Sequence, residues 1–326
     1  MPIDTTLTIY SPDLLSQIQA NILSGDFSVL ARVLSKASEK TQPKSNDDLD
    51  KLDHSLANLL SIPETHLRAK AALHLHGTNQ QNASWACFAN PVKMQPNRDH
   101  MVISQPDNFD FTDQEGEALT HELNDYFKED DIQFVYQTPG YWVCYCVTPH
   151  DITHYSPKAV LGENIMQFLP AAKDDVQWRK IFNEAQMLLH HSVTNQQRIS
   201  QGKNEINSLW FFGGGVLPEK YQSNYSHVFT DNSQLKGLSK LGGATVKPLP
   251  SRLSTERFES NTDSLIILDN PDDAMINTYL AEVLDLIEKK RISSFTIIPR
   301  HDQAFYLAPK DLKKFWRRTK DISCFF

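Results

Sequence analysis

The fold class is set by residues 265–298, which read LIILDNPDDAMINTYLAEVLDLIEKKRISSFTII. Two short apolar runs, Leu265–Asp269 and Phe295–Ile298, have the length and composition of buried strands. Between them Asn270-Pro271 marks a helix start, and apolar residues recur at helical spacing at Leu280, Val283, Leu284 and Ile287. This order of elements joins parallel strands, because only a crossover of this length returns the chain in the same direction. The sequence therefore predicts an α/β protein with a mixed, largely parallel sheet flanked by helices.

The N-terminal segment has the same character. Leu7–Tyr10 predicts a strand, and Ser11-Pro12-Asp13 predicts the start of a helix. Apolar spacing continues a helix to Glu39, the polar stretch Lys40–Asp50 predicts a loop, and leucines from 52 to 60 predict another helix. We assign residues 1–62 to an N-terminal strand and helical region that is part of the core.

A strand-rich α/β segment is predicted for residues 63–160. Strand patterns occupy 85–91, 101–104, 132–136 and 141–147, and Pro139-Gly140 fits a hairpin turn between the last two. Thr112 and Glu115 form a capping-box pattern at the start of a helix. Cys144 and Cys146 alternate with apolar residues, so both thiols face one side of a sheet as core residues.

The third predicted segment covers residues 161–326. Val176 to about Ile199 fits one long amphipathic helix, whereas the polar stretch Tyr221–Lys240 fits a surface excursion. Phe305–Leu307 predicts a further strand, and Lys310–Arg318 predicts a short basic helix at the C-terminus.

Composition excludes several classes of protein. The chain has 326 residues, 40% of them hydrophobic, and no apolar run approaches the roughly 20 residues that a membrane-spanning helix needs. Residues 1–6 lack a basic cluster followed by an apolar core, so we expect a cytoplasmic protein. A net charge of −8 argues against nucleic acid as the partner. The four cysteines lack the paired spacing of a zinc site or a disulfide framework, and we expect reduced thiols.

The main candidate for ligand binding lies between residues 195 and 215. An arginine fork and open backbone N–H groups suit a phosphate or a carboxylate. The candidate residues are Asn195, Arg198, Asn207, Trp210, Gly213, Gly214 and Gly215. The alternative is structural, because asparagine caps chain reversals, Arg198 can pair with an acidic neighbour, and glycines allow close packing against Trp210.

Histidines raise the question of a metal site. His74 and His76 would face the same side of a strand, and His150, Asp151 and His154 lie within five residues, but neither group has strong ligand spacing. Ser208 lacks a nucleophile-elbow context. We therefore predict no catalytic residue, no bound metal and no cofactor.

A second candidate is the basic C-terminus, where Phe315 and Trp316 interrupt a run of cations. Lys313, Lys314, Arg317 and Arg318 are the candidate residues for contact with an acidic protein partner or, against the overall charge, with nucleic acid. The alternative is a capped helix with a solvated basic face and its aromatic side chains in the core.

Several motifs together carry a resemblance to a known family. They are Trp85–Arg98 with Ala89-Asn90-Pro91-Val92, Val160-Leu161-Gly162, Trp178-Arg179, Asn183–His190, Asn207–Trp210 with Gly213-Gly214-Gly215, and Phe315–Arg318. With these motifs the chain resembles bacterial regulatory proteins of the RpfE type, many of which carry the label phosphoglycerate mutase because they are similar to the archaeal-type, cofactor-independent enzyme. Those mutases share a shorter set, which maps onto His191–Asn195, Arg198, Asn207, Trp210, Gly213, Gly215 and Leu235–Gly237.

The resemblance implies an alkaline-phosphatase-like architecture in a degenerate form. Such mutases use two metal ions, and their first metal-binding Asp-Gly stands at the end of the first strand, where this chain has Tyr10-Ser11-Pro12-Asp13. His191–Asn195 also reads His-Ser-Val-Thr-Asn in place of the usual His-Pro-Val-Asn. We therefore expect a non-catalytic regulatory protein that binds an anionic metabolite or a protein partner.

Two alternatives remain at this point. The first is an active phosphoglycerate mutase, or a related phosphoryl-transfer enzyme, with Mn²⁺ or Mg²⁺ bound by residues drawn from His74, His76, His150, Asp151 and His154. The second is an interaction module that uses only the basic C-terminus.

Overall fold

The chain is organised as two compact units. The computed structural model describes residues 5–20, 22–41, 51–80, 85–105, 110, 112–139, 141–153, 155–169, 176–253, 258 and 261–326. Unit 1 combines residues 1–64 with 220–326, and unit 2, residues 65–219, is inserted between them. The predicted boundary at 62/63 lies two residues from the first division, whereas the predicted boundary at 160/161 falls inside unit 2.

Unit 1 contains a seven-stranded mixed sheet in the order β2-β12-β11-β1-β10-β8-β9. The strands are β1 Thr6–Tyr10, β2 Ser38–Thr41, β8 His227–Phe229, β9 Thr245–Lys247, β10 Asp263–Ile267, β11 Ser294–Arg300 and β12 Gln303–Leu307. The five strands from β11 to β9 pair in parallel, whereas β12 is antiparallel to both β11 and β2. The predicted fold class, with a mixed and largely parallel sheet, is confirmed.

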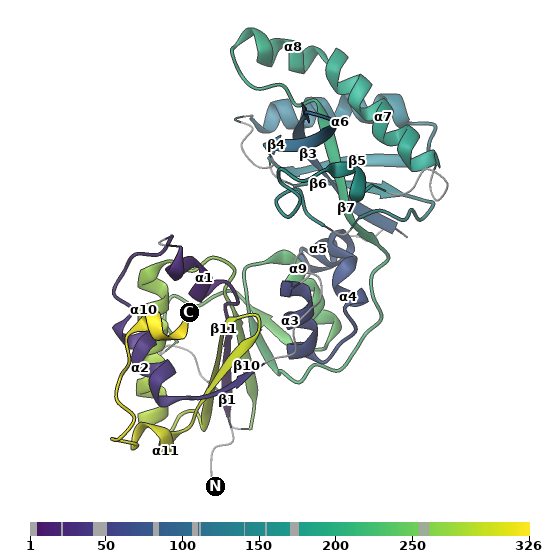
Figure 1. Ribbon diagram of the computed structural model, residues 1–326. Coiled ribbons are helices and arrows are strands. Elements are labelled where there is room, and N and C mark those ends of the chain that lie inside the picture. The colour runs from purple at the N-terminus through teal and green to yellow at the C-terminus, as the bar shows by residue number, and fades with distance from the viewer. Residues whose placement is uncertain are drawn as a thin grey trace. The chain divides into compact units, whose positions relative to one another are not determined.

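Helices cover both faces of this sheet. They are α1 Leu14–Gln19, α2 Ser28–Lys36, α3 Lys51–Leu60, α9 Ser233–Leu241, α10 Asp273–Glu288 and α11 Pro309–Leu312, with the 3₁₀ turn η3 at Ile322–Phe325. In Figure 1, α1, α2 and α10 lie on one side of the strands, and α3 and α9 lie on the other. The helix α10 is the predicted crossover between β10 and β11, and Asp272 caps it by accepting a hydrogen bond from the Met275 N–H at 2.7 Å. Its apolar face packs on Leu7, Ile9 and Phe295 in the core.

Unit 2 contains a five-stranded antiparallel sheet. Its strands are β3 Trp85–Asn97, β4 His100–Gln105, β5 Ile132–Thr138, β6 Tyr141–Cys146 and β7 Ser208–Gly215, in the order β4-β3-β6-β5 with β7 also paired to β3. The helices are α4 Thr65–Arg68, α5 Lys70–Gly77, α6 Asp113–Phe127, α7 Val176–His191 and α8 Val193–Ser200, with a 3₁₀ turn at Ile165–Gln167. The capping box of Thr112 and Glu115 is confirmed at the start of α6, and Cys144 and Cys146 lie buried in the core.

Three predicted elements differ from the structure. His74 and His76 lie on the helix α5, because its alanines and leucines pack against β3 and β7. The predicted long helix is divided at Ser192, whose hydroxyl accepts a hydrogen bond from the Asn195 N–H and begins α8. The stretch Tyr221–Lys240 is no surface excursion, because it contains β8 in the parallel sheet and most of α9.

The ends of unit 1 also differ from prediction. The helix α2 ends at Lys36, and Ser38–Thr41 pairs with β12, so the expected helix to Glu39 and the start of the loop are replaced by a strand. Residues 42–50 of that loop, like Gly140 of the hairpin turn and His154, lie outside the described residues. The C-terminal basic helix covers only Pro309–Leu312, and the aromatic side chains expected in the core are exposed, Phe315 by 85% and Trp316 by 65%. In the described part of the chain, the helices are too short or too polar to cross a membrane.

Candidate functional site

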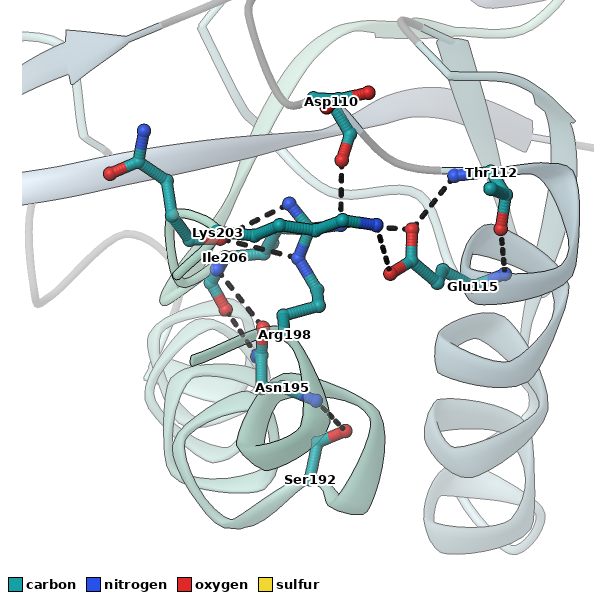
Figure 2. Close-up of polar contacts among 9 residues, drawn as sticks. Asp110, Thr112, Glu115, Ser192, Asn195, Arg198, Lys203 and Ile206 are labelled. Atoms are coloured by element: carbon teal, nitrogen blue, oxygen red, sulfur yellow. Dashed lines mark hydrogen bonds and ion pairs between the residues drawn. The ribbon is translucent and has the colours of Figure 1, made fainter. Parts of the chain in front are cut away.

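Asn195, the first residue of the predicted binding region, connects two segments of unit 2. Its side chain is fully buried, and Nδ2 donates hydrogen bonds to the carbonyl oxygens of Leu189 and Ile206, both at 2.7 Å. Oδ1 accepts a hydrogen bond from the Ile206 N–H at 3.1 Å. Asn195 thereby pairs the backbone at the end of α7 with the chain that leads into β7, as Figure 2 shows for Ile206.

Arg198 is enclosed by acceptors from distant parts of unit 2 (Figure 2). The side chain is 1% exposed, and Nη1 donates to a carboxylate oxygen of Glu115 at 3.0 Å and to the Asp110 carbonyl at 3.1 Å. Nε and Nη2 both donate to the Asn204 carbonyl, at 3.2 and 3.1 Å. All three guanidinium nitrogens are therefore engaged by the protein itself.

Glu115 is the counter-charge of this cluster. Its carboxylate also accepts hydrogen bonds from the Thr112 N–H and from the Lys203 ammonium group, at 2.7 and 3.1 Å. Burial pushes the pKa of Glu115 up, but these hydrogen bonds and the charges of Arg198 and Lys203 outweigh burial and hold the pKa below its ordinary value. The capping box of α6 is thus also the anchor of Arg198.

Asn207 and Trp210 make internal contacts as well. The Asn207 amide pairs with the backbone of Met94, donating to its carbonyl and accepting from its N–H, both at 2.8 Å. Trp210 is 1% exposed and donates its indole N–H to the Tyr155 carbonyl at 2.9 Å. Both side chains join β7 to neighbouring segments of unit 2.

The three glycines at the end of β7 allow the chain to pass closely by its neighbours. A Cβ atom on Gly214 would lie 2.4 Å from the Trp85 ring, and one on Gly215 would lie 2.7 Å from the Ala69 methyl. Gly213 has φ of +63°, and its N–H donates to the Thr153 carbonyl at 2.9 Å. These contacts support a packing role for the glycines. Ligand binding by the seven predicted residues stays a prediction.

The histidines considered as metal ligands pack against aromatic rings. His74 stacks on Tyr141, with ring centroids 6.1 Å apart, and burial lowers its pKa. His150 packs on Trp178, with ring centroids 4.7 Å apart. Across the described ranges, no group of three or more His, Cys, Asp or Glu side chains is placed to hold a metal ion. The expected absence of a bound metal stays a prediction.

The carboxyl ends of the parallel strands of unit 1 form a different polar region, which we call the carboxyl edge. Ligands of open α/β sheets bind at this edge. Here Asp269 follows β10 and accepts a hydrogen bond from the Asn232 amide at 2.7 Å. Burial raises the pKa of Asp269, the Asn232 hydrogen bond opposes that rise, and the charges of Asp13 and Asp231 add to it. The negative charges of Asp13, Asp231 and Asp269 therefore act on one another at this edge.

Sequence reasoning missed Asp231, Asn232 and Asp269. Asp269 closes the apolar run that predicted β10, and this position after a parallel strand was a usable signal. The other two were missed because their segment was interpreted as a surface excursion rather than as β8 and the start of α9.

A pocket of about 490 Å³ lies beside the predicted C-terminal residues in unit 1, and we call it the C-terminal pocket. Its lining includes Glu39, Phe305, Trp316, Arg317, Arg318, Lys320 and Phe325. Arg317 is committed to the fold, because Nη1 donates to the carbonyl oxygens of Lys36 and Ala37, both at 2.7 Å, at the end of α2.

The predicted partner-binding cations divide into two kinds. Lys314 pairs with Asp311 at 2.5 Å. Burial pushes the pKa of Asp311 up, but the hydrogen bond from Lys314 and other interactions outweigh burial and lower that pKa. Arg317 and Lys314 are partly buried, whereas Lys313 and Arg318 are exposed. Of the four, Arg318 alone both lines the C-terminal pocket and is exposed, within the described residues.

Comparison with known proteins gives partial matches. No protein-family model matches the chain. The 2,3-bisphosphoglycerate-independent phosphoglycerate mutase of Methanosarcina mazei is 30% identical over 106 residues, which are 31% of this chain and 25% of that enzyme's length. The structure of the PH0037 protein from Pyrococcus horikoshii has a TM-score of 0.51 at 11% identity and covers 94% of this chain and 88% of its own. A cofactor-independent phosphoglycerate mutase from Thermoplasma acidophilum has a TM-score of 0.47 at 14% identity, with 94% and 90% covered.

These matches show the fold and a partial sequence similarity. The chain is an α/β protein with a fold similar to that of the PH0037 protein, and about a third of its sequence is similar to a 2,3-bisphosphoglycerate-independent phosphoglycerate mutase.

Proposed function

We propose that this chain is a non-catalytic, phosphoglycerate-mutase-like regulatory protein of the RpfE type, which binds an anionic metabolite or a protein partner. The observation that carries the proposal is the turn after β1, where the resemblance places the first metal-binding Asp-Gly. Ser11 stands there instead, 2% exposed, and its N–H donates to the Ile298 carbonyl at 3.0 Å. The position of the metal-binding aspartate is therefore occupied by a buried serine that packs against the neighbouring strand.

The rest of the carboxyl edge supports the same proposal. Asp269 is held by Asn232 and repelled by Asp13 and Asp231, so a phosphate group would meet further repulsion there. The C-terminal pocket suits a negatively charged ligand better, because three cationic residues and one carboxylate line it. The cations are Arg317, Arg318 and Lys320, and the carboxylate is Glu39. We therefore place recognition at the C-terminal pocket and no chemistry at the carboxyl edge.

The proposal is tested by a mutase assay on the full chain with 3-phosphoglycerate and added Mn²⁺ or Mg²⁺. The M. mazei enzyme serves as the positive control, and elemental analysis of the purified chain gives its metal content. We expect turnover at the level of the blank and less than one metal ion per chain. Turnover that a chelator abolishes, and that Asp269→Asn also removes, would replace this proposal with an active mutase.

A further inference from the structure

We infer that the C-terminal pocket and the adjoining strand β2 bind an extended acidic segment of a partner protein, with an aromatic residue of that segment in the pocket. This inference rests on the proposed function and specifies the partner. It is carried by three independent features of unit 1, which are an open strand, an aromatic pocket beside it, and cations at the rim.

The open strand is β2. In the part of the chain that the structure describes, β2 ends the sheet order next to β12, and all four of its residues are exposed. Such an edge can accept a further strand, with main-chain hydrogen bonds supplying affinity and side-chain pockets supplying specificity. Glu39 and Lys40 place opposite charges on this edge. These charges disfavour the addition of a neutral apolar strand, whereas a strand with charged side chains can pair with them.

Pockets flank this edge on both faces. Glu39 and its cross-strand partner Phe305 line the C-terminal pocket. Ser38 and its partner Tyr306 line a second pocket of about 290 Å³, together with Lys310 and Lys314. Successive side chains of an added strand point to opposite faces, so each face would receive alternate residues.

The aromatic residues that line the pocket favour an aromatic residue of the partner as the group that binds there. Phe305 and Trp316 both line the pocket; Phe305 is buried, and Trp316 is 65% exposed. Tryptophan and arginine are enriched at the centres of protein interfaces, where they gain most from desolvation. A pocket for a small metabolite encloses about 70–90% of its ligand, and the exposure of Trp316 on an open sheet edge instead fits an extended chain.

The positive charge of the residues that line the pocket favours an acidic partner. Arg317, Arg318 and Lys320 line the C-terminal pocket against one carboxylate, Glu39, in a chain whose net charge is −8. Arg317 donates hydrogen bonds to carbonyl groups at the end of α2, whereas Arg318 and Lys320 have exposed side chains. Carboxylates on either side of the anchor would pair with these two cations.

The test is fluorescence anisotropy with a labelled ten-residue peptide that has two phenylalanines at alternate central positions and glutamates elsewhere. We expect saturable binding to the full chain that weakens as salt is added. A peptide with lysine in place of glutamate, and one with proline at the central positions, should each bind at least tenfold more weakly. Equal binding of the proline peptide would overturn the strand-addition geometry.

Matched variants locate the site. Arg318→Glu and Trp316→Ala should each weaken binding at least tenfold, whereas Lys313→Glu, an equal charge change at an exposed residue that does not line the C-terminal pocket, should change it less than threefold. Equal weakening by Arg318→Glu and Lys313→Glu would reduce the effect to net charge and overturn the inference. Unchanged far-ultraviolet circular dichroism of each variant shows that it is folded.

Other occupants of the surface give distinct results. Equal competition by single-stranded DNA of ten nucleotides, or by 3-phosphoglycerate at millimolar concentration, would overturn the inference in favour of those ligands. Self-association of the chain that Trp316→Ala abolishes would assign the surface to a second copy. The mutase assay is independent of these measurements, so peptide binding by an active enzyme would contradict the proposed function and leave this inference standing.

Discussion

Charged groups in the two units differ in how completely the protein satisfies them. In unit 2, Arg198 is buried, and all three of its nitrogens have acceptors within 3.2 Å. In unit 1, Asp269 is repelled by two other carboxylates, and Arg318 is exposed beside a pocket. A charge that the fold satisfies contributes stability, whereas one left open is available for recognition. The difference supports a structural role for Arg198 in unit 2 and the binding role that we propose for the C-terminal pocket of unit 1.

The largest expected effect on stability comes from removing the buried, fully hydrogen-bonded charge of Arg198. Arg198→Met should lower the free energy of unfolding of unit 2 by about 3–5 kcal/mol, because Glu115 and the Asn204 carbonyl lose their partner in a buried setting. Tryptophan fluorescence during urea unfolding measures this, since Trp85, Trp142, Trp178 and Trp210 lie in unit 2.

Arg318→Met is the matched control, with an expected change below about 0.5 kcal/mol. A loss below about 1 kcal/mol for Arg198→Met, together with weaker binding of a phosphate compound, would instead support the ligand role that the sequence predicts for Arg198.

The second effect concerns the triple glycine. Gly214→Ala should lower the free energy of unfolding by about 1–3 kcal/mol, because the added methyl would overlap the Trp85 ring. The control is Val216→Ala, two residues further along and 56% exposed, which should change stability by less than about 0.5 kcal/mol. If Gly214→Ala leaves the free energy of unfolding unchanged, close packing does not require the glycines. Ligand binding by the exposed backbone would then be the better explanation for them.

The third effect separates two neighbours of the basic run. Arg317→Met should cost unit 1 about 1 kcal/mol, because the last carbonyl groups of α2 lose two hydrogen bonds and a nearby cation. Hydrogen exchange of the α2 amides measures the loss, and Arg318→Met should leave that exchange unchanged. Equal effects of the two substitutions would remove the distinction between a structural cation and a free one.

Local sequence patterns predicted the part of the fold that local contacts determine. The β10–α10–β11 unit follows from periodicity within 34 residues, and the capping box of α6 from residues three apart. The insertion of unit 2 was beyond such reasoning, because β7 pairs with β3 more than 100 residues earlier. Likewise β2 depends on its pairing with β12 and not on the propensity of Ser38–Thr41.

The candidate sites show the same limit. The sequence singled out Arg198 and Arg317 as cations available to a ligand or a partner. Whether each is free depends on residues 83 and about 280 positions away, Glu115 for Arg198 and the end of α2 for Arg317. Spacing along the chain could not supply those partners, and the family resemblance singled out the residues without their roles.

The acid titrations of the two units should have opposite signs. The pKa of Glu115 lies below its unfolded value of about 4.3, so its contribution to the stability of unit 2 is complete above that pH and is lost as pH falls through the folded pKa. The pKa of Asp269 lies above its unfolded value of about 3.9, so unit 1 loses stability as pH rises through that window. Hydrogen exchange resolved by segment, from pH 3 to 7, follows both units in one sample.

The smallest expected effect is also the only gain. Asp269→Asn should raise the stability of unit 1 at neutral pH, because it removes a charge that burial, Asp13 and Asp231 disfavour while keeping an oxygen that accepts the Asn232 hydrogen bond. The control is Asp285→Asn, which breaks an exposed pair with Lys289 and should cost less than about 0.5 kcal/mol. Amide exchange in β1 and β10 gives the direction. If Asp269→Asn is less stable than the parent at neutral pH, or if Mn²⁺ stabilises only the parent, the carboxyl edge holds a cation and the two units no longer differ as argued.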